Sequence, residues 1–167
     1  MIGTKKIVDT YRRLAKALGT RRVVLIGGCA VKLAAGPSRK VNDVDVAVIM
    51  PYGEFLEHRK RLESANFELK VGNVISLYDR TNMIDVDLGK KKEFGPMGKS
   101  FGMTNSEIGS TALVKPVKLG GEVFGCAVMG PEQMLRMKVW LLLNRKHDTR
   151  KQAADRRDII SILKKFY

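Results

Sequence analysis

Residues 43–49 read Asp-Val-Asp-Val-Ala-Val-Ile, and this strict alternation constrains the chain more than any other feature of its sequence. Alternate residues on a β-strand share a face, so the pattern predicts a strand with one aliphatic face. The carboxylates of Asp43 and Asp45 then lie on the other face, roughly 6–7 Å apart along the strand. Two such carboxylates repel each other, and a bound divalent cation relieves the repulsion. Because hard oxygen ligands suit magnesium, the pair predicts a magnesium site.

A second acidic strand is predicted at residues 83–88, which read Met-Ile-Asp-Val-Asp-Leu. A third carboxylate from this strand would complete a site for two metal ions, which stabilise the attacking and leaving oxygens in phosphoryl transfer. We assign this role to Asp85, as a metal ligand or as the base that takes the proton from an attacking hydroxyl, and keep Asp87 as the reserve. The alternative for any single Asp is a solvated strand face, which the repetition of Asp-x-Asp in two strands makes weaker.

Gly27 and Gly28 follow a short apolar strand at residues 21–26 and precede a predicted helix at residues 29–35. Glycines at a strand end let backbone N–H groups approach a phosphate closely, and a helix N-terminus favours negative charge. A Gly-Gly pair alone is usually just a turn, but here it stands shortly before the Asp43–Asp45 strand. The sequence contains neither a Walker A motif nor Gly-x-Gly-x-x-Gly, which argues against the P-loop and dinucleotide-binding folds.

Net charge is the strongest signal in the composition. The 31 Lys and Arg residues outnumber the 17 Asp and Glu residues and give the chain a net charge of +14. Such a field attracts polyanions, which favours a nucleic acid or a nucleoside triphosphate as partner. A generally basic surface explains the charge equally well, because the basic residues are spread along the whole chain.

The remaining composition favours a reduced, cytoplasmic protein with no membrane partner. The longest apolar runs are far too short to span a bilayer, and the first residues lack the apolar core of a signal peptide. Cys29 and Cys126 are the only cysteines, too few for a disulfide scaffold, and we expect both to be reduced and buried.

The order of the predicted elements indicates an α/β (α+β) fold, with a mixed β-sheet flanked by helices and a C-terminal helical pair. We expect a single domain over residues 1–167, with an α/β core at 1–130 and helices at 131–167. The predicted helices span residues 4–18, 29–35, 54–65, 132–145 and 150–165. The predicted strands span residues 21–26, 43–49, 74–78 and 83–88, with a hairpin at 111–119 and 122–129. Residues 89–110 are expected to form a long loop or a weakly structured excursion.

The chain resembles the DNA polymerase beta-type nucleotidyltransferase superfamily. The resemblance rests on Val24-Leu25-Ile26-Gly27-Gly28-Cys29-Ala30 followed by Asn42-Asp43-Val44-Asp45-Val46, and it covers about residues 20–163. The more specific similarity is to minimal prokaryotic branches, including the AbiEii-like toxin enzymes and related uncharacterised nucleotidyltransferases. Their helix with a Met-Lys pair and a later Arg is similar to Met137-Lys138 and Arg145. Their closing Asp-x-x-Asp helix is similar to the segment that holds Asp155 and Asp158.

The resemblance implies roles for individual residues. Asp43 and Asp45 would bind metal, Asp85 would be a metal ligand or base with Asp87 in reserve, and Gly27 and Gly28 would hold the nucleoside triphosphate. Cys29 and Arg39 lie at nucleotide-binding positions, and Lys138 and Asp155 match positions that function in toxin-type members. A surface lysine and an ion pair of Asp155 and Asp158 with Arg145, Arg156 or Lys138 are the structural alternatives. Two departures stand out: relatives have Ser or Thr at Cys29, and a hydroxyl residue at Val41.

The predicted activity is transfer of a nucleoside monophosphate from a triphosphate such as ATP to a hydroxyl, with magnesium as cofactor and release of pyrophosphate. The net charge favours tRNA or another RNA as the acceptor, and a protein side chain or a small antibiotic-like molecule fits the minimal architecture. The alternative is a non-catalytic nucleotide- or RNA-binding module, such as an antitoxin or a sensor with a partner protein. The substitutions at Cys29 and Val41 favour this alternative, and the carboxylates oppose it.

Overall fold

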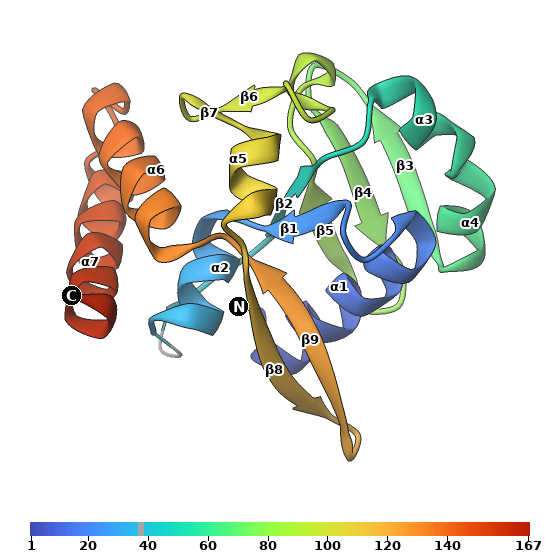
Figure 1. Ribbon diagram of the computed structural model, residues 1–167, viewed down its shortest axis with the longest axis horizontal. Helices are drawn as coiled ribbons and strands as arrows, with labels where there is room; N and C mark the ends of the chain where they lie inside the picture. The colour runs from blue at the N-terminus through green and yellow to red at the C-terminus, as the bar shows by residue number, and fades with distance from the viewer. Residues whose placement is uncertain (37–38) are drawn as a thin grey trace.

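In the computed structural model, which describes residues 1–36 and 39–167, seven strands form one mixed sheet (Figure 1). Their order across the sheet is β3-β4-β5-β2-β1-β9-β8, so the two acidic strands are neighbours near the middle. The strands are β1 (Val23–Leu25), β2 (Val44–Val48), β3 (Phe67–Val71), β4 (Ile75–Asp79), β5 (Ile84–Asp87), β8 (Leu113–Leu119) and β9 (Glu122–Val128). A separate pair consists of β6 (Lys99–Ser100) and β7 (Met103–Thr104).

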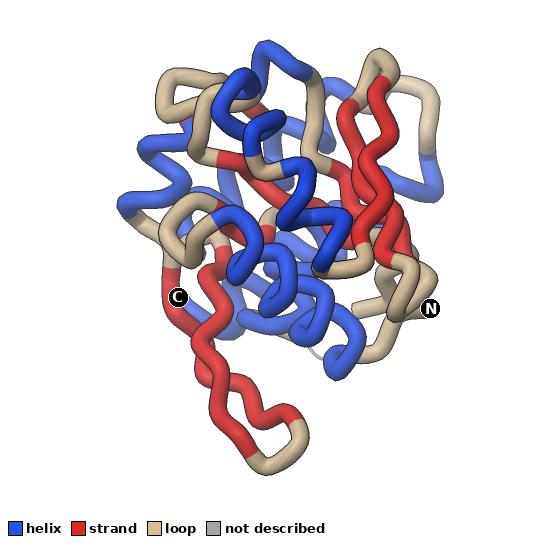
Figure 2. The backbone as a smooth tube through the Cα atoms, turned by 90° about the vertical axis from the view of Figure 1, so that its right-hand side faces the viewer, coloured by secondary structure: helices blue, strands red, loops and turns tan. Residues whose placement is uncertain are grey.

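The helices surround this sheet, and the last two lie side by side at one end of it, next to α2 (Figure 1). The β8–β9 hairpin projects from the body of the molecule (Figure 2). The helical segments are α1 (Thr4–Leu18), α2 (Gly27–Ala34), α3 (Tyr52–Glu57), α4 (Arg59–Ser64), η1 (Lys91–Glu93), α5 (Asn105–Ser110), α6 (Pro131–Asn144) and α7 (Thr149–Phe166). The expected α/β class with a mixed sheet and a C-terminal helical pair is therefore confirmed.

Helix α1 spans the residues that its apolar spacing predicts. Ile7, Tyr11, Leu14 and Leu18 lie on one face and are all buried, as helical spacing requires. The helix ends at Gly19, which adopts a positive φ of 106°, a conformation that glycine accepts without steric cost. This face packs on β1, β8 and β9 and covers one side of the sheet.

Pairing at the centre of the sheet fixes the register of the two acidic strands. Strand β2 pairs antiparallel with β1 on one side and parallel with β5 on the other. In the parallel pair, Val44 lies opposite Val86, and Asp45 lies opposite Asp87. The aliphatic residues of both strands therefore share the buried face, while Asp45 and Asp87 share the opposite face.

The structure differs from the expected local structure in three places. The segment 89–110 is not a structureless loop, because it contains η1, β6, β7 and α5. The predicted helix at residues 54–65 is two short helices that meet at His58. Residues 67–71 form β3, an edge strand that was not predicted; Phe67 is buried and Val71 is exposed.

Asn105 holds the segment 89–110 against the sheet. Its side-chain Nδ2 donates to the backbone carbonyls of Val48 and Gly95, each at 3.0 Å, and to that of Glu93. Thr104 caps α5, since its hydroxyl accepts a hydrogen bond from the Glu107 N–H at 3.1 Å. A single buried amide group thereby connects β2 to a segment rich in glycine, for which the sequence shows no periodic pattern.

Asp79 is a fully buried carboxylate that joins α1 to the β4–β5 turn. Its side chain accepts a hydrogen bond from the Thr10 hydroxyl at 2.6 Å and forms an ion pair with Arg13. Burial by itself raises the pKa of Asp79, but the hydrogen bonds from Thr10 and Arg13 outweigh it and lower the pKa. The ionised carboxylate therefore stabilises the fold above the carboxyl pKa of the unfolded chain, and this stabilisation is lost as pH falls through the lowered pKa.

We predict that Asp79→Ala lowers the free energy of unfolding by about 3 kcal/mol at pH 7, because it leaves the Arg13 charge without this buried partner. Urea denaturation measures the effect. The control is Glu63→Ala, which removes an exposed ion pair with Arg59 and costs less than about 0.5 kcal/mol. Equal losses in the two variants would contradict a structural role for the Asp79 network.

Candidate functional site

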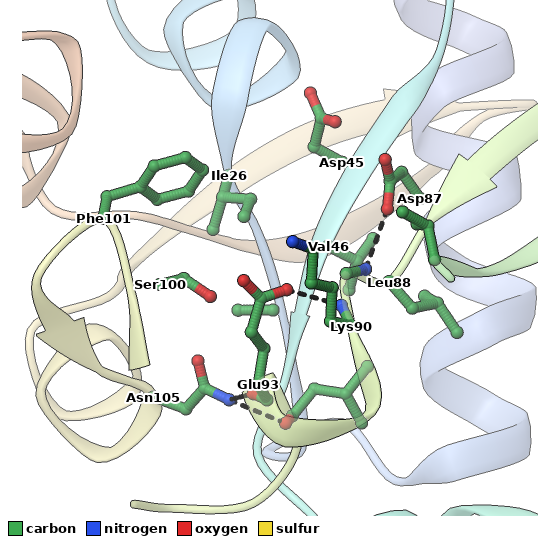
Figure 3. A pocket seen from close by; sticks show the side chains of 14 residues that line it. Ile26, Asp45, Val46, Asp87, Leu88, Lys90, Glu93, Ser100, Phe101 and Asn105 are labelled. Atoms are coloured by element: carbon green, nitrogen blue, oxygen red, sulfur yellow. Dashed lines mark hydrogen bonds between the residues drawn. The ribbon is translucent and has the colours of Figure 1, made fainter. Parts of the chain in front are cut away.

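The acidic face of the sheet is formed at the ends of β2 and β5. Asp45 and Asp87 lie directly opposite each other in the parallel pair, and Asp43 comes just before β2 (Figure 3 shows the first two). Asp43 is exposed, whereas Asp45 and Asp87 are partly buried. The structure thus brings three carboxylates from two neighbouring strands to one place that is open to solvent.

Burial and like charges act together on Asp45 at this face. Its pKa is raised to about 7, first because the carboxyl is buried and then because Asp43 and Asp87 carry like charges. The ammonium of Lys138 and a hydrogen bond from the Gly28 N–H act in the opposite direction and do not outweigh these effects. Asp43, Asp45 and Asp87 therefore form an electrostatically coupled group with an excess of negative charge.

Asp85 lies elsewhere on the same strand. Its side chain is 68% exposed, and one carboxylate oxygen is 3.6 Å from the Nζ of Lys70 on β3. Its neighbour across the sheet is Tyr78, which lies on the side away from β2. The structure therefore places Asp87, rather than Asp85, beside Asp45, and gives Asp85 the geometry of an exposed surface ion pair.

Gly27 and Gly28 allow the turn after β1 to pass directly over Asp45. Gly27 begins α2 with a φ of +62°, and a Cβ there would lie 2.8 Å from Cγ of Asp45. A Cβ at Gly28 would lie 2.9 Å from a methyl group of Val41 and 3.6 Å from Nη2 of Arg39. Any side chain at Gly27 would displace the carboxylate, so this glycine is required by close approach as well as by backbone conformation.

Cys29 is fully buried and contacts the backbone of the acidic strand. Its Sγ donates to the carbonyl oxygen of Asp43 at 3.2 Å. Burial, followed by the charge of Asp45, raises the pKa of this thiol to about 12, so it stays protonated at neutral pH. The structure uses Cys29 to hold the start of the acidic strand against α2, and its Sγ is bonded to the protein itself.

A buried group of charges, here called the Lys138 cluster, lies across α6 and α7. Lys138 is 3% exposed, and its Nζ is 3.0 Å from Asp155 and 2.8 Å from Asp158. Arg145 pairs with Asp155 at 2.7 Å, and Arg39 pairs with Asp158 at 2.8 Å. Through Arg39, the cluster connects the C-terminal helices to the residues that precede β2. The spacing of Asp155 and Asp158 places both on one face of α7, which is the sequence signal for this cluster.

Two adjoining cavities meet at Asp45. The large cavity has a volume of about 890 Å³ and is bordered by the Gly27-Gly28 turn, Asp43, Arg39 and the Lys138 cluster. The small cavity, of about 190 Å³, is bordered by Asp87 and by the segment 89–110. Ile26, Asp45 and Phe101 line both. Phe101, which the sequence analysis did not single out, extends from the segment 89–110 toward the site in Figure 3.

The donor chemistry of the acidic face suits a hard divalent cation, since it offers carboxylate oxygens with mutual repulsion to relieve. The residues that would hold such an ion are Asp43, Asp45 and Asp87. Across residues 1–36 and 39–167, no three His, Cys, Asp or Glu side chains already surround a point at metal-ligand distances. Metal binding by these three carboxylates would therefore require them to move closer together. No helix in this described part of the chain is long and apolar enough to cross a bilayer.

The sequence matches no protein-family model and no curated protein, but solved structures share its fold. The solution structure of the antibiotic-resistance factor ANT(2'')-Ia superposes with a TM-score of 0.57 at 14% identity, over 96% of this chain and 86% of its own. The lincomycin-bound lincosamide antibiotic adenylyltransferase LnuA gives a TM-score of 0.53 at 15% identity, over 93% and 96%. The chain has the nucleotidyltransferase fold.

The same fold occurs as part of a much larger protein. Megavirus polyadenylate synthase superposes with a TM-score of 0.54 at 13% identity, over 96% of this chain but only 31% of that protein. This nucleotidyltransferase-fold chain therefore spans about a third of the length of the viral enzyme. At identities this low the likeness shows the shared fold, and the reaction has to be argued from the residues of the site.

We predict that Gly27→Ala lowers the free energy of unfolding by about 2 kcal/mol, because it strains a left-handed backbone position and displaces the Asp45 carboxylate. Urea denaturation is again the measurement. Gly53→Ala is the matched control, since Gly53 lies in α3 with open space around it, and there alanine stabilises by up to about 1 kcal/mol. A Gly27→Ala protein as stable as the wild type would contradict the close approach of the turn to Asp45.

Proposed function

We propose that this chain is a divalent-metal-dependent nucleotidyltransferase that moves a nucleoside monophosphate from a nucleoside triphosphate to an acceptor hydroxyl. The observation that carries the proposal is the position of Asp45. It lies beside Asp87 and close to Asp43, directly under the Gly27-Gly28 turn, and it borders both cavities. A carboxylate at this junction would face the nucleoside triphosphate in one cavity and the acceptor hydroxyl in the other.

The large cavity is the proposed triphosphate site. Its walls combine the Gly28 region of the glycine turn with Arg39, Lys138 and Arg145, and these cations suit the negative charge of the phosphates. Lys138 has three N–H donors. Its Nζ is 3.0 Å from Asp155 and 2.8 Å from Asp158, so two donors serve these aspartates and the third would reach a phosphate oxygen. Asp155 and Asp158 then orient this ammonium group.

Asp43, Asp45 and Asp87 are the proposed ligands of two magnesium ions. When bound, the ions would neutralise charge on the phosphates and on the attacking and leaving oxygens. In this assignment Asp87 replaces Asp85 as the third carboxylate. The acceptor hydroxyl gives its proton to a carboxylate of this group as its oxygen bonds to the α-phosphorus, and pyrophosphate leaves.

The acceptor and the branch of the superfamily are finer parts of the proposal. The net charge of +14 supports RNA, including tRNA, and the resemblance of the Lys138 region to AbiEii-like toxin enzymes supports a toxin–antitoxin context with a partner protein. The names of two structural neighbours, an antibiotic-resistance factor and a lincosamide adenylyltransferase, support a small molecule. If RNA is the acceptor, we expect binding to RNA that weakens steeply with salt; the other acceptors do not predict this.

A non-catalytic nucleotide- or RNA-binding module is the second candidate function. Two buried residues favour it: Cys29 and Val41 occupy positions where relatives have hydroxyl groups, and both are packed inside the protein. A phosphate would then bind through backbone N–H groups and cations alone. This module would bind magnesium and a nucleoside triphosphate in the large cavity without transferring the monophosphate.

We predict that the chain transfers label from an α-labelled triphosphate in the presence of magnesium, and that Asp87→Asn lowers the rate about 100-fold or more. The matched variant Asp85→Asn removes a carboxylate from the same strand two residues away and lowers the rate less than about threefold, because that ion pair is exposed. The assay uses each of the four triphosphates with total cellular RNA and a small-molecule extract, and follows label on RNA, protein and small molecules.

Three results would contradict parts of this proposal. A large loss with Asp85→Asn and none with Asp87→Asn would make Asp85 the third carboxylate after all. Magnesium-dependent triphosphate binding without label in any fraction would favour the non-catalytic module. Binding that persists in the double variant Asp43→Ala, Asp45→Ala would show that the metal site lies elsewhere.

A further inference from the structure

The small cavity is a partly open recess beside the acidic face. The carboxyl-terminal parts of β2 and β5 form one wall, and the segment 89–110 forms the other (Figure 3). Its volume of about 190 Å³ is below the roughly 300–1,000 Å³ typical of pockets for drug-sized ligands. It therefore has room for a single substituted ring, and a nucleotide with its base would not fit inside.

Asn105 presents an unpaired oxygen to this recess. The side chain is 1% exposed, and its Oδ1 has no hydrogen-bond partner among the described residues. The orientation of the amide is fixed, because its Nδ2 donates to three backbone carbonyls that cannot themselves donate. Figure 3 shows the oxygen turned away from Glu93, toward the side where Ser100 lies. A buried acceptor without a donor is costly, so this oxygen is available to accept a hydrogen bond from a ligand N–H or O–H.

Half of the lining residues are apolar, and the other polar groups in the lining are mainly acceptors. Asp45, Asp87 and Glu93 contribute carboxylates, Ser100 contributes a hydroxyl, and Phe101 contributes an apolar ring face. Lys90 is the cation among the lining residues, and it is exposed. On a chain with a net charge of +14, this local excess of negative charge stands out. It disfavours a phosphate-rich acceptor here and favours hydroxyl and amine groups.

We infer that the small cavity binds the acceptor, a compact molecule of one ring that carries hydroxyl and amine donors, and that Asn105 Oδ1 receives one of these donors. This inference rests on the proposed nucleotidyltransferase function and specifies its acceptor. One hydroxyl of the ring would lie at Asp45 and Asp87, next to the triphosphate in the large cavity. Its oxygen bonds to the α-phosphorus and its proton passes to Asp87, while the bond between the α- and β-phosphates breaks and its electron pair leaves with pyrophosphate.

The test is an NMR titration of the whole chain with glucosamine, a one-ring probe with both hydroxyl and amine groups. We expect saturable shifts of the Asn105 side-chain amide and of the Ser100 and Phe101 backbone amides. Ser100→Leu, which fills the recess, should weaken this binding at least about tenfold. Lys99→Leu, on the same short strand but outside the cavity lining, should leave it within about twofold.

The same samples separate this inference from the function on which it rests. Magnesium with ATP should shift the Gly27 and Gly28 amides in the wild type and in both variants, which also shows that the variants are folded. Wild-type glucosamine shifts that do not saturate, that map elsewhere, or that persist in Ser100→Leu would overturn the acceptor site. So would a short RNA that perturbs Asn105 and Ser100 where glucosamine does not. Absence of Gly27 and Gly28 shifts in the wild type with magnesium and each of the four triphosphates would instead overturn the proposed function.

Discussion

Mutual repulsion among Asp43, Asp45 and Asp87 is the constraint on which the rest of the site depends. The parallel register of β2 and β5 places Asp45 opposite Asp87, and the Gly27-Gly28 turn passes over Asp45 with no room for a side chain. Such an arrangement is unfavourable for the isolated fold, because burial and two like charges both oppose ionisation of Asp45. It is explained if the protein works with divalent cations at this place.

The Lys138 cluster supplies the opposing charge. A lysine that is 3% exposed is costly to desolvate, and its ion pairs with Asp155 and Asp158 offset that cost without adding much net stability. The main effect of these ion pairs is to position the C-terminal helices. The cluster fixes α6 and α7 against Arg39 and keeps cationic groups across the large cavity from the acidic face. The basic half of the site thus combines Arg39, close to the acidic strand in sequence, with residues of the two C-terminal helices.

Local patterns predicted much of this molecule. The bounds of α1, the alternating strands and the two C-terminal helices follow from apolar periodicity, and the pairing of Asp43 with Asp45 follows from the two-residue period of a strand. Alternation places Asp85 and Asp87 on one face but does not say which of them meets Asp45. That choice depends on the register with β2, a contact between distant parts of the chain, and the structure places Asp87 there.

The segment 89–110 could not be predicted for a different reason. Its glycines and short elements give no periodic signal, and its order comes from hydrogen bonds that Asn105 makes to the backbone of β2 and of the segment itself. The proposed acceptor side of the candidate site is built from this segment. The sequence therefore predicts the residues of the nucleotide side but not those of the acceptor side. Asp158 shows the same limit: its spacing from Asp155 indicates a shared face, but its partner Arg39 is known only from the fold.

The raised pKa of Asp45 also contributes to the dependence of stability on pH. Between the unfolded carboxyl pKa of about 4 and the folded value, the folded chain binds more protons, so metal-free protein loses stability as pH rises through this window. A bound divalent cation favours the ionised carboxylate, so the metal-bound protein would not lose this stability as pH rises.

The most direct test of the account is therefore the titration of the Asp45 carboxyl carbon by NMR, with and without magnesium. The account predicts a pKa of about 7 without the metal and a decrease of more than about two units at saturating magnesium. A pKa near 4 without metal, or the same raised value with and without magnesium, would contradict it.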